Sequence, residues 1–368
     1  MLKRFEVCNF KNFERNVVLD LSNVKGYEFN TNLIDNNHVR CASIFGKNSS
    51  GKSNICKALL DIVNHLTDNR KTTSDVLPYV NLNSEKKTVD FVYEFIFDNI
   101  ELKYAYSKRS PEELDYEKLI INGETYIEYN FFTHEGYCKL KGTENLNKKL
   151  TDNTLSFVKY INNNSILEDN EVNHVFRKFI QYVNSMLLFS SLEGNRYFGF
   201  LSDANESISD SIVKKGKLGD FNQFLNKLDI ECHLISREIN GKYEIFNQFK
   251  NGEANFFSTA STGTKALTLF YYWLINATEA SLIIMDEFDA FYHFELSEEI
   301  VKEIIKETSG QVIFTSHNTN LMDTDLFRPD CLFLIQKNGI KSLADLTDKE
   351  LRKAHNLQKM YKAGLFDE

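Results

Sequence analysis

One stretch of the sequence decides the fold: Gly46-Lys47-Asn48-Ser49-Ser50-Gly51-Lys52-Ser53. It matches the P-loop pattern G-x-x-x-x-G-K-[ST] in the required context, because the apolar segment 41–45 precedes it and the helix-forming stretch 53–66 follows it. A strand, a glycine-rich turn and a helix direct a row of backbone N–H groups at one place, with the positive end of the helix dipole behind them. That arrangement suits the phosphates of a nucleoside triphosphate.

The residue types in this stretch predict how such a nucleotide is held. We expect Lys52 to reach the β- and γ-phosphates and the Ser53 hydroxyl to bind Mg²⁺. Further contacts come from the loop and the first turn of the helix, since their backbone groups face the phosphates. The residues predicted here to bind nucleotide are Gly46, Asn48, Ser49, Ser50, Gly51, Lys52, Ser53 and Asn54.

Length and composition indicate a globular protein with one large or two modest cores. The chain has 368 residues, of which 42% are apolar, and it contains only 3 prolines. The longest nearly apolar run, residues 266–277, is too short to span a bilayer, and the first residues lack the apolar region of a signal peptide. We therefore expect a cytoplasmic protein without a membrane partner.

Cysteine spacing and net charge argue against two classes of function. The six cysteines are scattered and form no C-x-x-C pair, which predicts reduced, mostly buried thiols rather than a zinc site or a disulfide framework. The formal net charge of −9 argues against a protein that coats nucleic acid by charge alone. DNA binding stays open as an alternative, but the lysine clusters at 148–149 and 214–217 are more typical of solvated surface.

The two ends of the chain show helices that alternate with apolar strands. Residues 7–21 predict two short strands before the P-loop. After residue 229 the pattern predicts a hairpin, helices and buried strands, and then a second hairpin. These elements are the strands 232–238 and 243–249 around Asn240-Gly241, the helix 263–277, the strand 281–285, the helix 296–308, the strand 311–315, and the strand 331–336 before Asn338-Gly339.

The middle of the chain has a different pattern. Residues 91–97, 102–107 and 119–129 alternate apolar and polar side chains, as half-buried antiparallel strands do, and Asn122-Gly123 predicts a hairpin turn. Residues 170–188 and 220–228 predict amphipathic helices.

The fold class that follows is α/β, with a P-loop nucleotide-binding head built from both chain ends. We expect residues 1–67 and 229–368 to form this head. Residues 68–228 are expected as an inserted segment, β-rich and then helical, that makes partner or dimer contacts.

A buried strand that ends in two acids supplies the next part of the site. Residues 281–285 are almost entirely apolar, as a strand covered on both faces requires. We expect Asp286 to join the Mg²⁺ shell and Glu287 to orient and polarise the water that attacks the γ-phosphate. Alone, the pattern is an ordinary strand before a polar turn, and only the P-loop favours the catalytic interpretation.

Two other junctions between apolar and polar residues fit the same site. The strand 311–315 leads into Ser316 and His317, and this histidine is suited to hydrogen-bond the γ-phosphate or the attacking water. Residues 258–265 open the helix 263–277 with hydroxyl groups that form an N-cap and would also face an anion. A lone histidine or N-cap is more often structural, so both interpretations depend on the other motifs.

The set and its order resemble the ABC-type ATPase heads of the SMC and RecF group. Members carry a P-loop, a signature motif before a helix, a Walker B Asp-Glu pair and a switch histidine, and the signature motif of one subunit closes on the ATP bound by another. The resemblance implies that Lys52, Glu287 and His317 act in cis. It implies contacts in trans from a signature motif made of Ser261, Thr262, Gly263 and Thr264, with Ser261 and Gly263 on the γ-phosphate.

The N-terminal residues Asn9-Phe10-Lys11-Asn12-Phe13 resemble the Asn-Phe-Arg/Lys-Ser strand of the same group, whose basic residue contacts nucleotide. By this resemblance Lys11 and Asn12 bind nucleotide. A surface lysine on an edge strand is an equally good interpretation of the sequence.

Within the group, the chain resembles the stand-alone AAA family ATPases of bacterial phage-defence systems, of the RloA and abortive-infection AbiLi type, with the Septu and PARIS ATPases as relatives. It departs from them at residues 291–294, in a loop that crosses the dimer interface of relatives. The related OLD proteins carry a C-terminal Toprim nuclease, and we expect the segment after His317 to be too short for one. The likeness rests on Asp286-Glu287-Phe288-Asp289-Ala290, Thr315-Ser316-His317-Asn318-Thr319, Arg328-Pro329-Asp330 and Tyr361-Lys362-Ala363-Gly364.

The favoured hypothesis is therefore an ATPase of an anti-phage, abortive-infection system. It would use ATP and Mg²⁺, form a head-to-tail homodimer or higher oligomer around the nucleotide, and control a separate effector protein. The alternative is an ATP-gated protein of the RecF and SMC kind that acts on DNA in repair or recombination. The formal net charge of −9 disfavours this alternative. A third, a switch that binds ATP but barely hydrolyses it, is disfavoured by Glu287.

Overall fold

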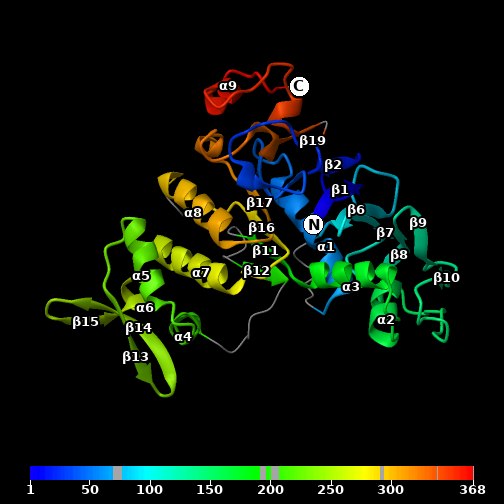
Figure 1. The fold of residues 1–368 in the computed structure, drawn as a ribbon, viewed down its shortest axis with the longest axis horizontal. Helices are drawn as coiled ribbons and strands as arrows, with labels where there is room; N and C mark the ends of the chain where they lie inside the picture. Colours follow the sequence, from blue (N-terminus) through cyan, green and yellow to red (C-terminus); the bar gives the residue numbers. More distant parts are fainter. Residues whose placement is uncertain (69–76, 191–195, 200–206, 291–293, 338, 368) are drawn as a thin grey trace.

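Two seven-stranded sheets and a helical lobe build the molecule (Figure 1). The computed structural model describes residues 1–68, 77–190, 196–199, 207–290, 294–337 and 339–367. The fold is mixed α/β, as the sequence predicts. Among the described helices, none combines the length and the apolar character that crossing a membrane requires.

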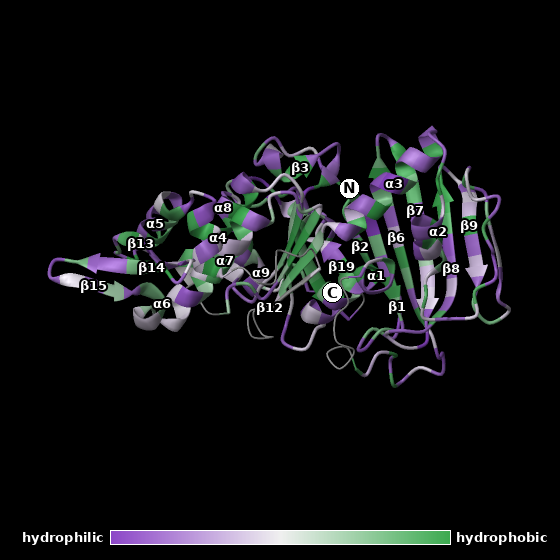
Figure 2. Ribbon diagram, turned by 90° about the horizontal axis from the view of Figure 1, so that it is seen from below, coloured by the Kyte–Doolittle hydropathy of each residue, from purple (hydrophilic) through white to green (hydrophobic). Residues whose placement is uncertain are grey.

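The central sheet has the strand order β12-β11-β16-β17-β5-β18-β19. Its strands from β11 to β18 are parallel, and the edge strands β12 and β19 are antiparallel to their neighbours. Parallel strands covered on both faces need apolar side chains throughout, and these strands are the continuously hydrophobic ones in Figure 2. Their bounds are β5 Cys41–Phe45, β11 Met186–Ser190, β12 Arg196–Gly199, β16 Leu282–Asp286, β17 Gln311–Thr315, β18 Leu332–Gln336 and β19 Gly339–Ser342.

The second sheet is antiparallel, in the order β10-β9-β8-β7-β6-β1-β2. Burial alternates along β6, because one face of this sheet packs on the core and the other meets solvent. Asn122 and Gly123 have φ values of 48° and 80°, so the predicted hairpin turn is confirmed. The bounds are β1 Leu2–Cys8, β2 Val17–Asp20, β6 Val89–Phe97, β7 Ile100–Lys108, β8 Leu114–Ile121, β9 Glu124–Asn130 and β10 Glu135–Cys138.

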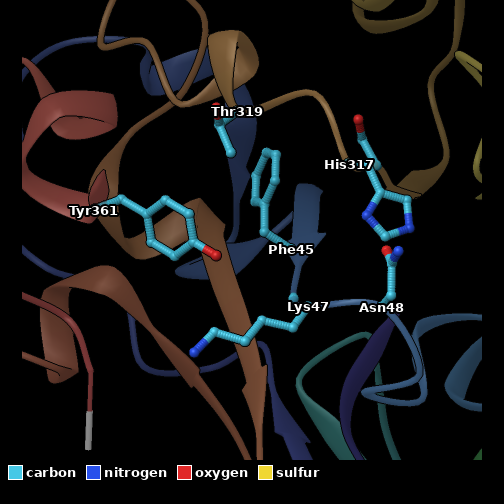
Figure 3. Close-up of a pocket in the computed structure, with 8 residues that line it drawn as sticks. Phe45, Lys47, Asn48, His317, Thr319 and Tyr361 are labelled. Carbon is cyan, nitrogen blue, oxygen red and sulfur yellow. The ribbon is translucent and has the colours of Figure 1, made fainter. Parts of the chain in front are cut away.

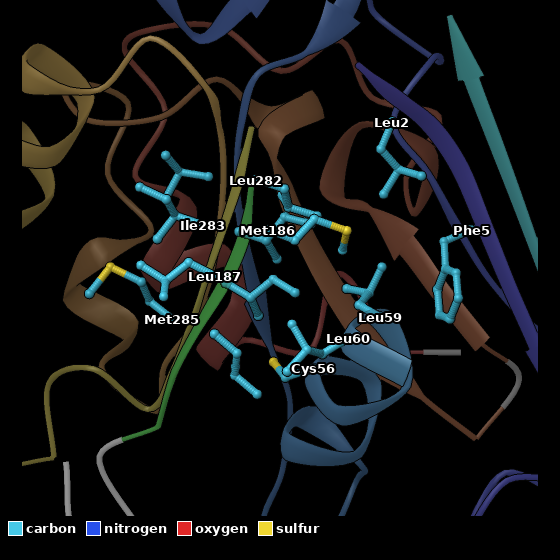
Figure 4. Packing of buried hydrophobic residues seen from close by; sticks show 14 of the residues in the cluster. Leu2, Phe5, Cys56, Leu59, Leu60, Met186, Leu187, Leu282, Ile283 and Met285 are labelled. Atoms are coloured by element: carbon cyan, nitrogen blue, oxygen red, sulfur yellow. The ribbon is translucent and has the colours of Figure 1, made fainter. Parts of the chain in front are cut away.

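Helix α1, Lys52–Leu66, lies between the two sheets and is buried along most of its length. On one side Cys56, Leu59 and Leu60 face the central sheet (Figure 4). On the other side, the hydroxyl of Tyr93 in the second sheet donates to the Ala58 carbonyl over 2.8 Å. The helix that follows the P-loop therefore joins the two sheets.

An ion pair is buried between α1 and the second sheet. The Lys108 ammonium of β7 lies 2.7 Å from the Asp61 carboxylate of α1, and their side chains are 0% and 3% exposed. Tyr106 and Tyr79 also donate to the two oxygens of Asp61, over 2.9 Å and 3.0 Å. Three donors thus compensate the desolvation of one carboxylate.

The helices divide between the two ends of the molecule. Helices α2, Phe157–Asn164, and α3, Glu171–Asn184, pack beside α1 and the second sheet. The helical lobe lies at the opposite end, and its small sheet β13-β14-β15 projects outward (Figures 1 and 2). The lobe contains α4 Ile208–Lys214, α5 Leu218–Lys227, β13 Leu234–Ile239, β14 Lys242–Phe249, β15 Gly252–Asn255, α6 Phe256–Thr259, α7 Thr262–Asn276 and α8 Phe294–Glu307.

The C-terminal helix α9, Leu357–Lys362, packs on the 3-10 turn η3, Thr319–Leu321, which follows β17. The Gln358 side chain donates to the Thr319 hydroxyl over 3.2 Å. The other short elements are η1 Thr31–Leu33, β3 Ile34–Asp35, β4 His38–Val39, η4 Pro329–Cys331 and η5 Leu343–Asp345.

Most predicted elements are confirmed within a few residues, but two expectations are wrong. The helix expected over 170–188 ends at Asn184, and Met186–Ser190 instead forms β11 of the central sheet. Residues 9–16 are not strand, because positive φ values at Asn9 and Lys11 turn the chain there. Asn338, expected in the last hairpin turn, lies outside the described residues.

Residues 68–228 contribute strands to both large sheets. The division of the chain into a head and an inserted segment, and the role of that segment in partner or dimer contacts, stay predictions.

Candidate functional site

The P-loop folds as an open turn at the N-terminus of α1. Ser49 and Gly51 have φ values of 63° and 108°, and a Cβ at Gly51 would lie 2.5 Å from a ring carbon of Phe13. Only glycine fits at Gly51, which is the N-cap of α1. Within the described residues no side chain caps this end and no acid lies in the first turn. The free N–H groups are therefore available to an anion.

Lys52 spans the loop. Its ammonium donates to the Gly46 carbonyl over 3.1 Å and lies 2.9 Å from Nε2 of His317. Burial lowers the pKa of Lys52, and the nearby carboxylates of Glu287 and Asp286 oppose that effect. The P-loop lysine, the two acids and the histidine, which come from distant parts of the sequence, therefore converge.

His317 stands between a cation and an anion. Its Nε2 atom lies 2.9 Å from the Lys52 ammonium and 3.1 Å from a carboxylate oxygen of Glu287. Without a proton, Nε2 accepts from Lys52; with one, it donates to Glu287. The side chain can thus pass between two hydrogen-bonding states by moving one proton.

Asp286 is the buried member of the acid pair. Its carboxylate accepts a hydrogen bond from Thr315 over 2.8 Å and another from the hydroxyl of Ser53. Burial raises the pKa of Asp286, and the two hydrogen bonds counteract this rise. The predicted metal residues Ser53 and Asp286 are therefore adjacent.

Glu287 follows with a left-handed backbone, at a φ of 46°. Such a conformation is unfavourable for a glutamate and persists only where the surroundings enforce it. Its N–H donates to the Thr315 hydroxyl over 2.9 Å, and its carbonyl accepts from Ala290 over 3.1 Å. These hydrogen bonds fix the backbone of Glu287, and its carboxylate lies beside His317 and the P-loop.

Three side chains that the structure places at or beside this site were not predicted to be site residues. Thr315 joins Asp286 and Glu287, and the Ser316 hydroxyl donates to Asp289 over 2.5 Å. Both lie in the polar end of the strand before His317, so their position was a usable signal. Tyr361 of α9 lines a cavity beside the P-loop with Lys47 and His317 (Figure 3), and no local pattern links it to that site.

The N-terminal residues reach the P-loop in part. Asn12 donates to the Ser50 carbonyl over 3.4 Å and accepts from Asn54 over 2.6 Å. Lys11 donates instead to the Leu77 carbonyl, over 3.4 Å. Asn12 and Asn54 are thus adjacent to the loop, and the nucleotide contact expected of Lys11 stays a prediction.

The expected signature motif forms no hydrogen bond to the P-loop within the part of the chain that the structure describes. Ser261 caps α7, because its hydroxyl accepts from the Thr264 N–H over 3.1 Å. Ser261 and Thr262 are exposed, and Gly263 and Thr264 are half-buried. This helix end is therefore presented to solvent. Residues 291–293, where the chain departs from the resembled family, lie outside the described residues.

The residues present fit ATP with Mg²⁺. A carboxylate and a hydroxyl are the hard oxygen ligands that Mg²⁺ prefers, and Asp286 and Ser53 supply both. Among the described residues, no group of three or more His, Cys, Asp or Glu side chains is placed to hold a metal alone. Mg²⁺ that arrives with nucleotide takes its other ligands from phosphate and water, so two protein ligands suffice.

A family assignment rests on most of the chain. Residues 41–323 match the family model described as "AAA domain, putative AbiEii toxin, Type IV TA system". The chain belongs to this AAA family. The P-loop, the acid pair Asp286-Glu287 and His317 all lie within the matched residues. No curated protein matches the sequence.

Three solved structures show a distant likeness. The SMC head domain from Thermotoga maritima is 16% identical, with a TM-score of 0.45 over 93% of this chain and 98% of that one. An SMC head domain from Pyrococcus furiosus, bound to the C-terminal domain of ScpA, is 14% identical, with a TM-score of 0.45 over 94% and 97%. The recombination mediator RecF is 12% identical, with a TM-score of 0.42 over 93% and 98%. Similarity this low assigns no activity, substrate or partner to the chain.

Proposed function

We propose that this AAA family member hydrolyses ATP to ADP and phosphate. The observation that carries the proposal is the convergence of three side chains at the open N-terminus of α1. Nε2 of His317 lies 2.9 Å from the Lys52 ammonium and 3.1 Å from a carboxylate oxygen of Glu287. Phosphoryl transfer to water requires a cation that binds the phosphates and a group that orients the attacking water. Lys52 supplies the first, Glu287 supplies the second, and His317 lies between them.

Each side chain has a task that follows from its surroundings. Lys52 exchanges its contact with His317 for the β- and γ-phosphates when ATP enters the loop. Ser53 and Asp286 would hold Mg²⁺, which would neutralise charge on the phosphates. Glu287 accepts a hydrogen bond from the attacking water, because its rigid backbone keeps the carboxylate at the mouth of the loop. His317 donates to the γ-phosphate once Lys52 has moved away.

We further propose that hydrolysis takes place in a head-to-tail dimer. The support is the exposed, capped N-terminus of α7, which forms no hydrogen bond to its own P-loop among the described residues. An exposed helix N-terminus that carries the hydroxyl groups of Ser261 and Thr262 suits the γ-phosphate of a nucleotide on another subunit. The biological role that we propose is control of a separate effector protein in an anti-phage, abortive-infection system.

Glu287→Gln tests the hydrolysis step. It keeps the size of the side chain and removes the base, so we expect ATP binding to persist and phosphate release to fall about 100-fold or more. Lys52→Ala should instead lose ATP binding. Glu238→Gln, at an exposed end of β13, is the matched control and should behave as wild type. Wild-type turnover by Glu287→Gln would refute the mechanism.

Recovery of partners tests the biological role. Glu287→Gln and Lys52→Ala are isolated from the native host with ATP and Mg²⁺, and bound proteins are identified by mass spectrometry. A single protein recovered only with Glu287→Gln supports effector control. DNA and repair factors that are lost at high salt would replace the defence role with an ATP-gated function on DNA.

A further inference from the structure

Strand β11 places Ser190 beside the acid pair. β11 runs parallel to β16, and Ser190 is the register partner of Asp286. Register partners on neighbouring strands carry their side chains on the same face of a sheet, about 5 Å apart. The Ser190 hydroxyl therefore lies on the same face as the Asp286 carboxylate. Thr315 of β17 flanks that carboxylate from the other side.

The shared face is the one that α1 covers. Asp286 accepts from Ser53, in the first turn of α1. Figure 4 shows Met186, at the start of β11, on the same side of the sheet as Cys56 and Leu59 of α1. Ser190 is four residues further along the strand, and side chains at even spacing share a face. Its hydroxyl thus points toward the space between β11, Asp286 and the start of α1.

Among the described residues, the Ser190 hydroxyl has no hydrogen-bond partner. Ser190 is 2% exposed, and its Oγ atom is unsatisfied within the described residues. Leaving a buried hydroxyl unpaired costs about 1–3 kcal/mol, so buried hydroxyls in proteins nearly always have a partner. The rest of β11 is apolar. Other buried serines, such as Ser43, are also unpaired among the described residues, and Ser190 differs from Ser43 in its position opposite a predicted metal ligand, where its hydroxyl is available to a partner that arrives with the nucleotide.

We infer that Ser190 is a positioning residue of the Mg²⁺–ATP site: its hydroxyl hydrogen-bonds a water molecule bound to Mg²⁺ next to Asp286. This inference rests on the proposed function. The chemistry fits, because Mg²⁺ retains water ligands and hydroxyl groups hydrogen-bond them without displacing them. Thr315 fixes one side of the carboxylate, and Ser190 orders the water on the other.

The test compares three substitutions in the full chain: Ser190→Ala, Ser190→Thr, which keeps the hydroxyl, and Ser43→Ala. Ser43 is the matched control, since it is also a buried serine with an unpaired hydroxyl, in the middle of β5. Binding of a fluorescent, non-hydrolysable ATP analogue is titrated with Mg²⁺. Mn²⁺ binding in the presence of the analogue is measured by electron paramagnetic resonance.

For Ser190→Ala we expect the apparent affinity for Mg²⁺ and for Mn²⁺ to fall about 10-fold, with analogue binding in the absence of metal unchanged. Ser190→Thr should recover most of the affinity, and Ser43→Ala should titrate as wild type. Should Ser190→Ala fail to fold, Ser190→Cys replaces it, because a thiol keeps the volume but is a weak donor.

Either of two results from the Ser190 variants would overturn the inference: a wild-type metal titration for Ser190→Ala, or an equal loss in Ser190→Thr. An equal loss in Ser43→Ala would do the same, since it would show a general effect on the sheet. If the wild-type protein binds no nucleotide with or without metal, the proposed function fails, and this inference fails with it.

Discussion

The hydroxyl of Thr315 donates to Asp286 over 2.8 Å and ties together the two strands that carry the candidate catalytic residues. The same oxygen accepts from the N–H of Glu287 over 2.9 Å. One buried side chain on β17 thus sets the position of the predicted metal ligand, at the end of β16, and of the predicted base that follows it.

Thr315→Val should therefore impair catalysis more than folding. Valine has nearly the same shape and suits a buried strand, but it leaves Asp286 and the Glu287 N–H each short of a partner, at a total cost of about 2 kcal/mol in the free energy of unfolding. Misplacement of the reacting groups should lower phosphate release about 100-fold. Urea unfolding and a phosphate-release assay measure the two effects.

Thr308→Val is the control for that experiment. It removes a buried hydroxyl that donates to the Ile304 carbonyl over 2.6 Å, at the end of α8. Stability should fall slightly, and hydrolysis should be unchanged. Equal hydrolysis by both variants would show that Thr315 has no role in placing the acids.

Asp286→Asn should stabilise the nucleotide-free protein while it abolishes hydrolysis. Burial raises the pKa of Asp286, so its contribution to stability is complete at pH values below the ordinary carboxyl range and is lost as the pH rises through the raised pKa. At pH 7 the ionised carboxylate is a net cost, and a neutral amide removes it, for a gain of about 1 kcal/mol.

Thermal unfolding at pH 7 checks this prediction, with and without ATP and Mg²⁺. The nucleotide-free melting temperature of Asp286→Asn should exceed that of wild type, and the further rise on adding Mg²⁺ and ATP should be smaller. A lower nucleotide-free melting temperature would mean that the hydrogen bonds from Thr315 and Ser53 outweigh the cost of the buried charge.

Breaking the buried ion pair on α1 should be severely destabilising. Lys108→Met leaves the Asp61 carboxylate buried without its cation, and we expect a loss of about 3–5 kcal/mol in the free energy of unfolding. Lys103→Met, on the same strand, breaks a partly exposed pair with Glu94 and should cost less than about 1 kcal/mol. Urea unfolding followed by circular dichroism distinguishes the two, and equal losses would contradict the assigned role of the buried pair.

Mixing two inactive variants tests the dimer. Lys52→Ala disables the P-loop, and Ser261→Arg blocks the N-terminus of α7. If the two parts belong to one site made by two subunits, a mixed dimer holds one intact site. An equimolar mixture should then recover about a quarter of wild-type ATP hydrolysis. A mixture that stays as inactive as each variant would refute sharing of a site between subunits.

The parts of the site that could be predicted from the sequence lie where strong local patterns occur. The glycines and Lys52 have fixed spacing, and the strands before Asp286 and His317 are long apolar runs with polar ends. The meeting of Lys52, His317 and Glu287 then follows from parallel strands whose carboxyl ends share one edge of the sheet.

Other parts could not be predicted because local pattern does not contain them. Residues 186–189 are apolar at every position, so they continue an amphipathic helix as readily as they form a strand. Treating them as helix hid β11, and with it the position of Ser190. The placement of Tyr361 beside Lys47 depends on tertiary packing of α9 against η3, which no short-range spacing reports.

The position of β5 in the central sheet has a consequence for synthesis of the protein. This strand leads into the P-loop early in the chain, yet its neighbours are β17 and β18, which are translated near the end, and Gly46 packs against Ile335 of β18 so closely that a Cβ would lie 2.5 Å from it. Contacts so distant in sequence form slowly and late. A nascent chain therefore has no finished nucleotide pocket until almost all of it has left the ribosome, and a chain interrupted before β18 presents the apolar β5 to chaperones and proteases.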